Sequence, residues 1–217
     1  MFERVLRDTF THKNPLVFYN NHADFQQTSA ISGQIGVSTG GVTEGLKNRV
    51  VMPIAMSNQQ TFHVLGHELV HAFQFHMLLS GDSTGLQSLG NLPLWIVEGM
   101  AEYMSKGRID AHTAMWMRNA VLNDDVPSLK QMTINPKYFP YRYGQAFWSF
   151  ISGYYGDDIM KELFILTAKY GVEIAIDSLL NISTETLSGM FIEGMKTHFK
   201  QYLGDDLKEN RIGTQII

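Results

Sequence analysis

The chain has 217 residues, of which 44% are hydrophobic and 18% charged, with a net charge of −4 and no cysteine. This length predicts one domain, or two closely packed lobes, with a core that needs no disulfide or structural metal ion. The absence of cysteine excludes thiolate metal sites and cysteine catalysis. The weak negative charge, without a lysine or arginine block, argues against a nucleic-acid or anionic-membrane partner.

The N-terminal third predicts mixed structure. The charged stretch 1–10 predicts a short helix and lacks the apolar core of a signal peptide. Apolar, β-branched segments predict three short strands at 15–20, 34–39 and 49–54. Pro53 marks the third as an edge strand, and the glycine-rich STGGVTEG before it predicts a turn. No run of about 18 apolar residues predicts a transmembrane helix, although the chain can still be a piece of a longer exported protein.

Helical patterns begin at Ser57, which forms a predicted capping box with Gln60. This first long helix is expected to reach about Leu79 and to stop before Gly81. A second helix is expected from a cap at Asn91, with Pro93 in its first turn, to Gly107, and Asp110 is expected to cap a third. After a loop at 133–140, further helices are predicted at 141–155, 157–170, 172–180 and 186–203.

These elements predict an α+β fold. A small mixed sheet with an edge strand occupies the N-terminal part, a long helix follows, and the C-terminal half is mostly helical. We expect the sheet and the first two long helices at 1–107 and a helical lobe at 108–217, packed together as one compact domain.

The sequence HELVH (67–71) lies in the first long helix. His67 and His71 are four residues apart, so they share one helix face and can bind one tetrahedral zinc ion. Glu68 is rotated about 100° round the helix, where it can take a proton from a water that the metal activates. The alternative is a chance match on a surface helix. The surrounding apolar residues disfavour it, because burying unpaired glutamate and imidazole groups is costly.

Glu98 and Glu102 lie four residues apart on the second helix. One carboxylate can complete the zinc site, and the other can accept the N–H of a ligand histidine and fix its tautomer. The alternative is an amphipathic helix with two solvated glutamates, which fits poorly beside Trp95 and Met100.

The two motifs together resemble the gluzincin metallopeptidases, a clan that includes thermolysin and the zinc aminopeptidases. WIVEGMAEY (95–103) is similar to the W-x-x-E-G-x-A-E-Y of the peptidase MA-like group. The resemblance implies a zincin-like fold with a zinc ion in the cleft between sheet and helices. By position it makes Glu98 the third ligand and Glu102 the supporting carboxylate.

Two further stretches, FYNNHADFQQT and LKNRVVMP, resemble the peptidase-like part of bacterial cell-envelope proteins that continue into a TolB-like β-propeller. The resemblance implies a periplasmic, cell-envelope or secreted location and a flanking propeller. One departure is the 26 residues between His71 and Glu98, more than thermolysin or the aminopeptidases use. The segment 81–91 is therefore expected to form a loop near the cleft.

The resemblance also suggests residues that would contact the substrate. The aminopeptidases carry Y-x-K-G-x-A where this chain has YRYGQA, which makes Tyr141 the expected oxyanion donor and Tyr143 the fallback. The alternative is that both tyrosines only pack. Arg142 is expected either to bind a substrate carboxylate or to be exposed, and Glu44 lies roughly where the aminopeptidases bind a substrate amine. An edge strand before the motif helix is expected to pair with extended substrate.

The sequence therefore predicts a zinc metallopeptidase that acts on a peptide or protein substrate. His67, His71 and Glu98 hold the metal, Glu68 is the general base, and Tyr141 stabilises the oxyanion. The alternative from another class is a non-catalytic zinc-binding module, which binds peptides or partners within a larger cell-envelope protein. A third reading keeps the metal but has a non-peptidic amide as substrate.

Overall fold

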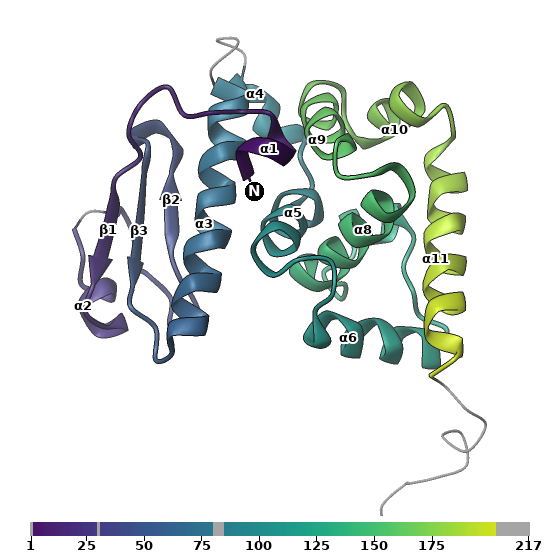
Figure 1. Ribbon diagram of the computed structural model, residues 1–217, viewed down its shortest axis with the longest axis horizontal. Helices are drawn as coiled ribbons and strands as arrows, with labels where there is room; N and C mark the ends of the chain where they lie inside the picture. Colours follow the sequence, from purple (N-terminus) through teal and green to yellow (C-terminus); the bar gives the residue numbers. More distant parts are fainter. Residues whose placement is uncertain (1, 30, 80–84, 203–217) are drawn as a thin grey trace, which may run out of the picture.

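The computed structural model describes residues 2–29, 31–79 and 85–202, which form a three-stranded sheet beside a set of helices (Figure 1). The strands are β1 (Leu16–Tyr19), β2 (Val42–Glu44) and β3 (Arg49–Pro53). The longer helices are α3 (Asn58–Leu79), α5 (Leu94–Lys106), α6 (Ala111–Leu122), α8 (Pro140–Tyr155), α9 (Ile159–Tyr170), α10 (Val172–Leu180) and α11 (Thr184–Lys200). Short helical segments are α1 (Phe2–Leu6), α2 (His22–Gln26), η1 (Gly45–Lys47), α4 (Gly85–Ser88), η2 (Leu89–Asn91) and α7 (Leu129–Ile134). The predicted α+β class is confirmed.

The sheet has the order β1-β3-β2, so β3 lies in the centre. β3 runs parallel to β1 and antiparallel to β2. The prediction of an edge strand at 49–54 is therefore wrong. Pro53 is tolerated because it is the last residue of β3, and the next N–H, of Ile54, donates to the carbonyl of Tyr19 at 2.8 Å. The edge strands are β1 and β2, and β2 contacts α3.

Two other N-terminal predictions are wrong. Residues 34–39 form no strand, because the N–H of Thr39 donates to the carbonyl of Gly36 at 3.1 Å and turns the segment on itself, while Ile35 is buried. The predicted turn STGGVTEG contains β2, whose three residues pair with β3 after the two glycines. The short helix near the N-terminus and the strand at 15–20 are confirmed by α1 and β1.

The helix that carries HELVH is confirmed. The N–H of Gln60 donates to the Ser57 hydroxyl at 3.2 Å, and α3 continues to Leu79. Gly81, its predicted stop, lies outside the described residues. α5 ends at Gly107 as predicted, but Asn91 does not cap it. Its side chain instead donates to the carbonyl of Ala168 at 3.0 Å.

The C-terminal helices follow the predicted ranges closely. Asp110 caps α6 by accepting the N–H of Thr113 at 2.8 Å, and α8, α9, α10 and α11 match the four predicted segments. α7, which begins with a capping box formed by Ser128 and Gln131, was not predicted. Of the predicted loop at 81–91, residues 85–91 form α4 and η2 instead, and residues 81–84 lie outside the described residues.

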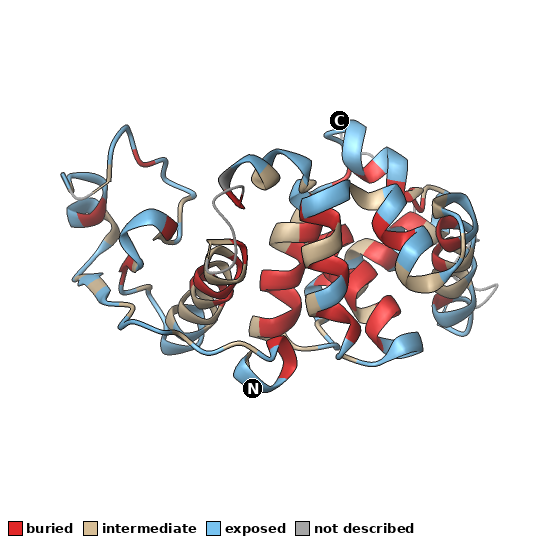
Figure 2. Ribbon diagram, turned by 90° about the horizontal axis from the view of Figure 1, so that it is seen from above, coloured by how far each residue is buried: buried red, intermediate tan, exposed pale blue. Residues whose placement is uncertain are grey.

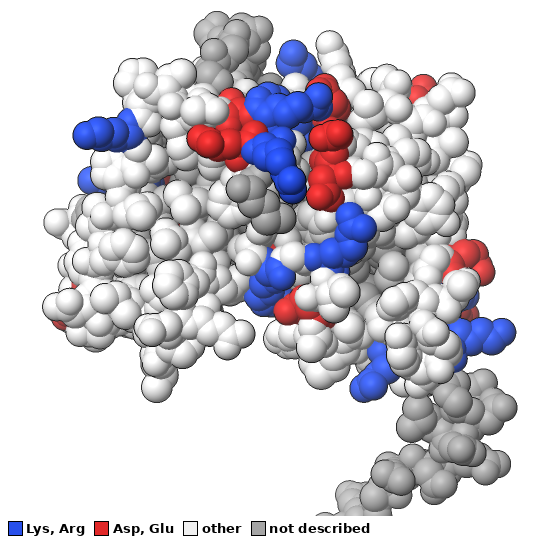
Figure 3. All heavy atoms as spheres, in the orientation of Figure 1, with Lys and Arg blue, Asp and Glu red and all other residues white. Residues whose placement is uncertain are grey.

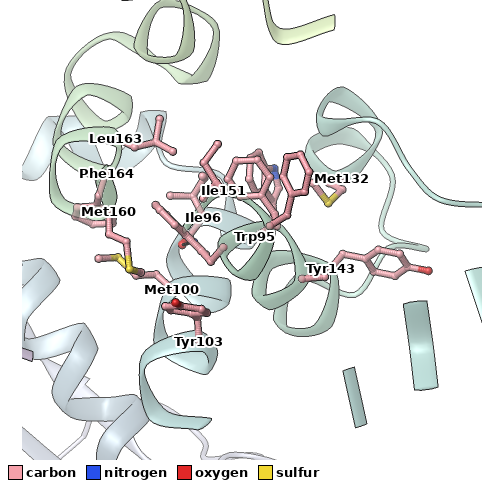
Figure 4. Close-up of a cluster of buried hydrophobic side chains, with 14 of the residues drawn as sticks. Trp95, Ile96, Met100, Tyr103, Met132, Tyr143, Ile151, Met160, Leu163 and Phe164 are labelled. Atoms are coloured by element: carbon pink, nitrogen blue, oxygen red, sulfur yellow. Dashed lines mark hydrogen bonds between the residues drawn. The ribbon is translucent and has the colours of Figure 1, made fainter. Parts of the chain in front are cut away.

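Most buried residues belong to the helices from α5 onward, as the red ribbon in Figure 2 shows. Figure 4 shows Trp95, Ile96 and Met100 of α5 packing with Ile151 of α8 and with side chains of α9. A smaller cluster of Phe25, Ile35 and Val51 lies at the sheet. α3 lies between the sheet and the helical part and contacts both.

α5 and α8 touch through two glycines. A Cβ built on Gly99 would lie 2.3 Å from the backbone carbon of Gly144, and one built on Gly144 would lie 2.2 Å from the carbonyl oxygen of Trp95. Because no side chain separates the backbones, Tyr141 and Arg142 at the start of α8 come close to Glu98 and Glu102 of α5. The glycine of the WIVEGMAEY motif therefore has a packing role.

Gly144→Ala is expected to lower the free energy of unfolding by about 1–3 kcal/mol or more, because the added methyl group meets backbone that cannot move aside easily. Gly153→Ala, on the same helix, is the matched control, since a Cβ there meets nothing within 4 Å. It is expected to stabilise the protein by about 0.5–1 kcal/mol. Urea unfolding of both variants measures the difference, and equal stabilities would contradict this view of the α5–α8 contact.

Among the described helices, none combines the length and the apolar character needed to span a lipid bilayer. On the face shown in Figure 3, lysine and arginine side chains lie beside aspartate and glutamate and form no broad basic patch. One example is Arg7, which pairs with Glu162 at 3.0 Å.

Candidate metal centre

Three metal-binding atoms converge between α3 and α5. The Nε2 atoms of His67 and His71 are 3.0 Å apart, and Oε2 of Glu98 lies 3.1 Å from the first and 3.3 Å from the second. These residues form one of two described clusters whose ligand atoms could hold a metal ion. The structure thus brings together the three residues that the motifs predict as ligands.

The tautomers of both histidines follow from their other ring nitrogens. Nδ1 of His67 lies 3.2 Å from Oε1 of Glu102, a carboxylate that can only accept. Nδ1 of His71 lies 2.8 Å from Oε1 of Gln74, whose amide nitrogen donates to the carbonyl of Val97 at 3.0 Å. Both Nδ1 atoms therefore donate, so the neutral form of each imidazole, the form that can bind a metal, has its Nε2 lone pair directed toward Glu98.

When both rings are neutral, three lone-pair atoms meet at a spacing that a metal cation could fill. Zinc binds nitrogen and oxygen ligands at about 2.0–2.2 Å, so its tetrahedral ligand atoms lie roughly 3.3 Å apart. The three separations fall close to that value. The donor set of two imidazoles and one carboxylate also suits zinc, so these residues fit the ion that the motifs imply.

A second cluster comprises His63, His67 and Glu102. Oε1 of Glu102 lies 2.9 Å from Nε2 of His63 and 3.2 Å from Nδ1 of His67. Its other oxygen lies 2.9 Å from Arg142 and 3.2 Å from Lys106, and these positive charges oppose a further cation. Glu102, the carboxylate expected to support the ligands, therefore contacts His67 on the side away from Glu98, and His63 shares this contact.

The charges of the centre are strongly coupled. Burial alone would raise the pKa of Glu98, but hydrogen bonds with His67 and His71 outweigh it and lower the pKa to about 2. Burial would lower the pKa of His67, yet hydrogen bonds with Glu102 and Glu98 raise it to about 9. A proton on His67 therefore balances the carboxylates when no metal is bound.

Zinc binding is expected to release about one proton at neutral pH, because the metal needs the lone pair that this proton occupies. Since the pKa of His67 is about 9, zinc affinity should rise about tenfold per pH unit from about pH 7 to 9 and then level off. Calorimetric titration in buffers of different ionisation enthalpy measures the released proton. An affinity that stays constant over this range would contradict the assignment of His67.

Glu68 lies beside the three ligands and is held by the sheet. The Thr43 hydroxyl of β2 lies 2.7 Å from Oε2 of Glu68 and 2.8 Å from its backbone oxygen. A Cβ on Gly41 would lie 2.8 Å from Cγ of Glu68, so the glycine leaves room for the carboxylate. The charge of Glu68 contributes to raising the pKa values of both His67 and Tyr141, which places it close to both.

Tyr141 covers the centre from α8. Its ring stacks on the imidazole of His67, with centroids 5.6 Å apart and planes 10° apart. Burial raises the pKa of its hydroxyl above the usual value, and the charge and hydrogen bonding of Glu98 raise it further. The hydroxyl therefore keeps its proton and remains a donor. Tyr143, labelled in Figure 4, belongs to the core cluster and packs edge-on against Tyr138, and burial raises its pKa to about 12.

Two residues predicted to contact the substrate form ion pairs within the protein. Arg142 is only 8% exposed and pairs with Glu102, which differs from both the substrate-binding and the exposed alternatives. Both carboxylate oxygens of Glu44 pair with cations, one with Lys47 at 2.6 Å and the other with Arg49. We assign neither residue to substrate binding.

Sequence reasoning missed the residues that hold the site in place: Thr43, Gln74, Lys106 and the glycine pair. Gln74 could have been found, because it lies three residues after His71 on the same helix and would be a costly polar group in a buried position without a partner. Thr43 and Lys106 carry no comparable signal, since their side chains are common on exposed surfaces.

Comparison with known proteins adds no relative: no family model, curated protein or solved structure matches the chain.

Proposed function

We propose that the protein is a zinc-dependent metallopeptidase of the gluzincin type. The observation that carries this proposal is the convergence of two Nε2 lone pairs and one carboxylate oxygen at zinc spacing, with Glu68 beside them. The motif resemblance and the α+β arrangement, with α3 packed between a small sheet and α5, support the same proposal.

A zinc ion held by His67, His71 and Glu98 would acidify a water molecule and polarise a substrate carbonyl. Glu68 is the general base that takes the proton of the attacking water and then delivers it to the leaving amine. Thr43 fixes this carboxylate by its 2.7 Å contact with Oε2. The 3% exposed Gln74 and the 2% exposed Glu102 keep the ligand histidines in the tautomer that presents Nε2.

Tyr141 supplies a hydrogen bond to the oxyanion that forms when the carbonyl is attacked. Its hydroxyl keeps its proton and forms a hydrogen bond with Glu98, one of the proposed ligands, so a donor is available beside the proposed zinc position. An extended substrate would add to β2, which pairs with β3 on one side and contacts the general base through Thr43. This strand replaces β3 as the expected substrate-pairing edge.

Tyr141→Phe is expected to lower kcat and kcat/KM together by about 100- to 1000-fold, the range for one oxyanion donor, with KM nearly unchanged. Zinc content should stay at the wild-type level, because the ring and its stacking on His67 remain. Steady-state kinetics on a cleaved peptide measure the loss.

Tyr143→Phe is the matched control, since the Tyr143 ring packs against Tyr138 and Trp116 whereas the Tyr141 ring stacks on His67, and it should change kcat little. A large loss in Tyr143→Phe with none in Tyr141→Phe would show that the donor is two residues away from the one we assign.

A peptide-library digest, analysed beside the zinc content of the protein, tests the proposed function. Zinc-loaded protein should produce new peptide termini, and a chelator should stop the cleavage until zinc is restored. Protein that holds one zinc ion and cleaves no peptide would instead support the non-catalytic zinc-binding module.

A further inference from the structure

We propose that Arg142 is a positioning residue of the metal centre, which holds Glu102 in the orientation that fixes His67. This inference rests on the proposed zinc site and concerns a residue that acts on it through Glu102. It assigns to an arginine of α8 a role in zinc affinity, although the arginine contacts no ligand of the metal directly.

The two oxygens of Glu102 have separate partners. Oε1 faces the histidines of α3, at 2.9 Å from His63 and 3.2 Å from His67. Oε2 faces the cations, at 2.9 Å from Arg142 and 3.2 Å from Lys106. With its side chain 2% exposed, Glu102 depends on these partners to remain charged. Rotation of the carboxylate would remove the acceptor of the His67 Nδ1–H.

Of the two cations, only Arg142 fixes Glu102 relative to another helix. Lys106 follows Glu102 by one turn on α5, so it moves with the residue it contacts. Arg142 belongs to α8 and is 8% exposed. Its Nη1 also lies 3.4 Å from the Thr113 hydroxyl and 3.5 Å from Asp110, the cap of α6. The guanidinium therefore connects α5 to α8 and to the start of α6.

The chain of contacts runs from Arg142 through Glu102 to His67 and ends at the zinc position. Such outer contacts typically change metal affinity by about 10- to 100-fold when they are lost. Glu102 contacts the proposed ligand His67, whereas Arg142 contacts Glu102. We therefore expect the effect of losing Arg142 on zinc affinity to lie at the lower end of that range.

Zinc affinity, measured by competition with a chromophoric chelator, tests the role without needing hydrolysis. Arg142→Met should weaken zinc binding about 10-fold. Arg142→Lys, which keeps the charge, should stay within about threefold of wild type. Arg108→Met is the matched control, because this arginine pairs with Asp157 instead, and it should leave the affinity unchanged. Thermal melting of the zinc-free variants separates loss of stability from loss of zinc.

A double-mutant cycle with Glu102→Gln completes the test. Glu102→Gln alone should weaken zinc binding by about 10- to 100-fold, and adding Arg142→Met should weaken it no further. Wild-type affinity in Arg142→Met, or full additivity in the cycle, would overturn the inference and leave the proposed function intact. If Arg142→Met does not fold, Arg142→Gln, which also removes the charge, takes its place in both measurements, and wild-type zinc affinity in that variant would overturn the inference. Wild-type protein that binds no zinc would overturn both proposals.

Discussion

Glu68→Gln is expected to lower kcat for peptide hydrolysis by about 100- to 10,000-fold, the contribution of one general acid–base group, while zinc content stays at the wild-type level. Glutamine keeps the size of the side chain and can still contact the Thr43 hydroxyl, but it cannot accept the proton of the attacking water. Kinetics on a peptide found by library digestion, together with metal analysis of the same sample, measure both quantities.

The control is Glu44→Gln, a carboxylate on β2 that pairs with Lys47 and Arg49 and has no proposed part in the reaction. It should retain most of the activity. Hydrolysis by Glu68→Gln at the wild-type rate would remove Glu68 as the base, even if the metal centre were correct.

Glu98→Ala is expected to weaken zinc binding by more than about 100-fold, beyond the usual effect of losing a supporting residue. Removing Oε2 leaves two imidazoles to hold the ion, and hydrolysis should disappear with the metal. The charge of Glu98 also holds the pKa of His67 high, so this variant should release less than one proton on zinc binding.

Glu162→Ala provides the comparison for Glu98→Ala, since that carboxylate is half exposed and pairs with Arg7 far along the chain. Its zinc affinity should equal that of the wild type. Equal zinc contents in Glu98→Ala and wild type would show that Glu98 is not a ligand.

The helices could be predicted because their signals are local. Ser57, Asp110 and Gly107 mark helix ends through interactions within a few residues, and the structure confirms each of these boundaries. The sheet was predicted less well. The place of β3 in the centre depends on pairing with both β1 and β2, which no local pattern encodes, and Pro53 suggested the opposite.

The candidate site also has a part that local sequence predicts and a part that depends on the fold. Spacing alone places His67 and His71 on one helix face, and the structure brings Glu98 to both of them. The contacts of Thr43 with Glu68 and of Arg142 with Glu102 join residues 25 and 40 positions apart, so they required the fold. The same holds for Gly99, whose contact with Gly144 sets the distance between α5 and α8.

Hydrolysis measured while zinc is added to the metal-free protein tests the central claim most directly. One ion held by His67, His71 and Glu98 should switch on peptide cleavage, so the rate should rise in proportion to added zinc and level off at about one equivalent. Calorimetry that shows one bound zinc ion per chain, with no peptide cleaved at any ratio of zinc to protein, would contradict the claim that this centre is a peptidase active site.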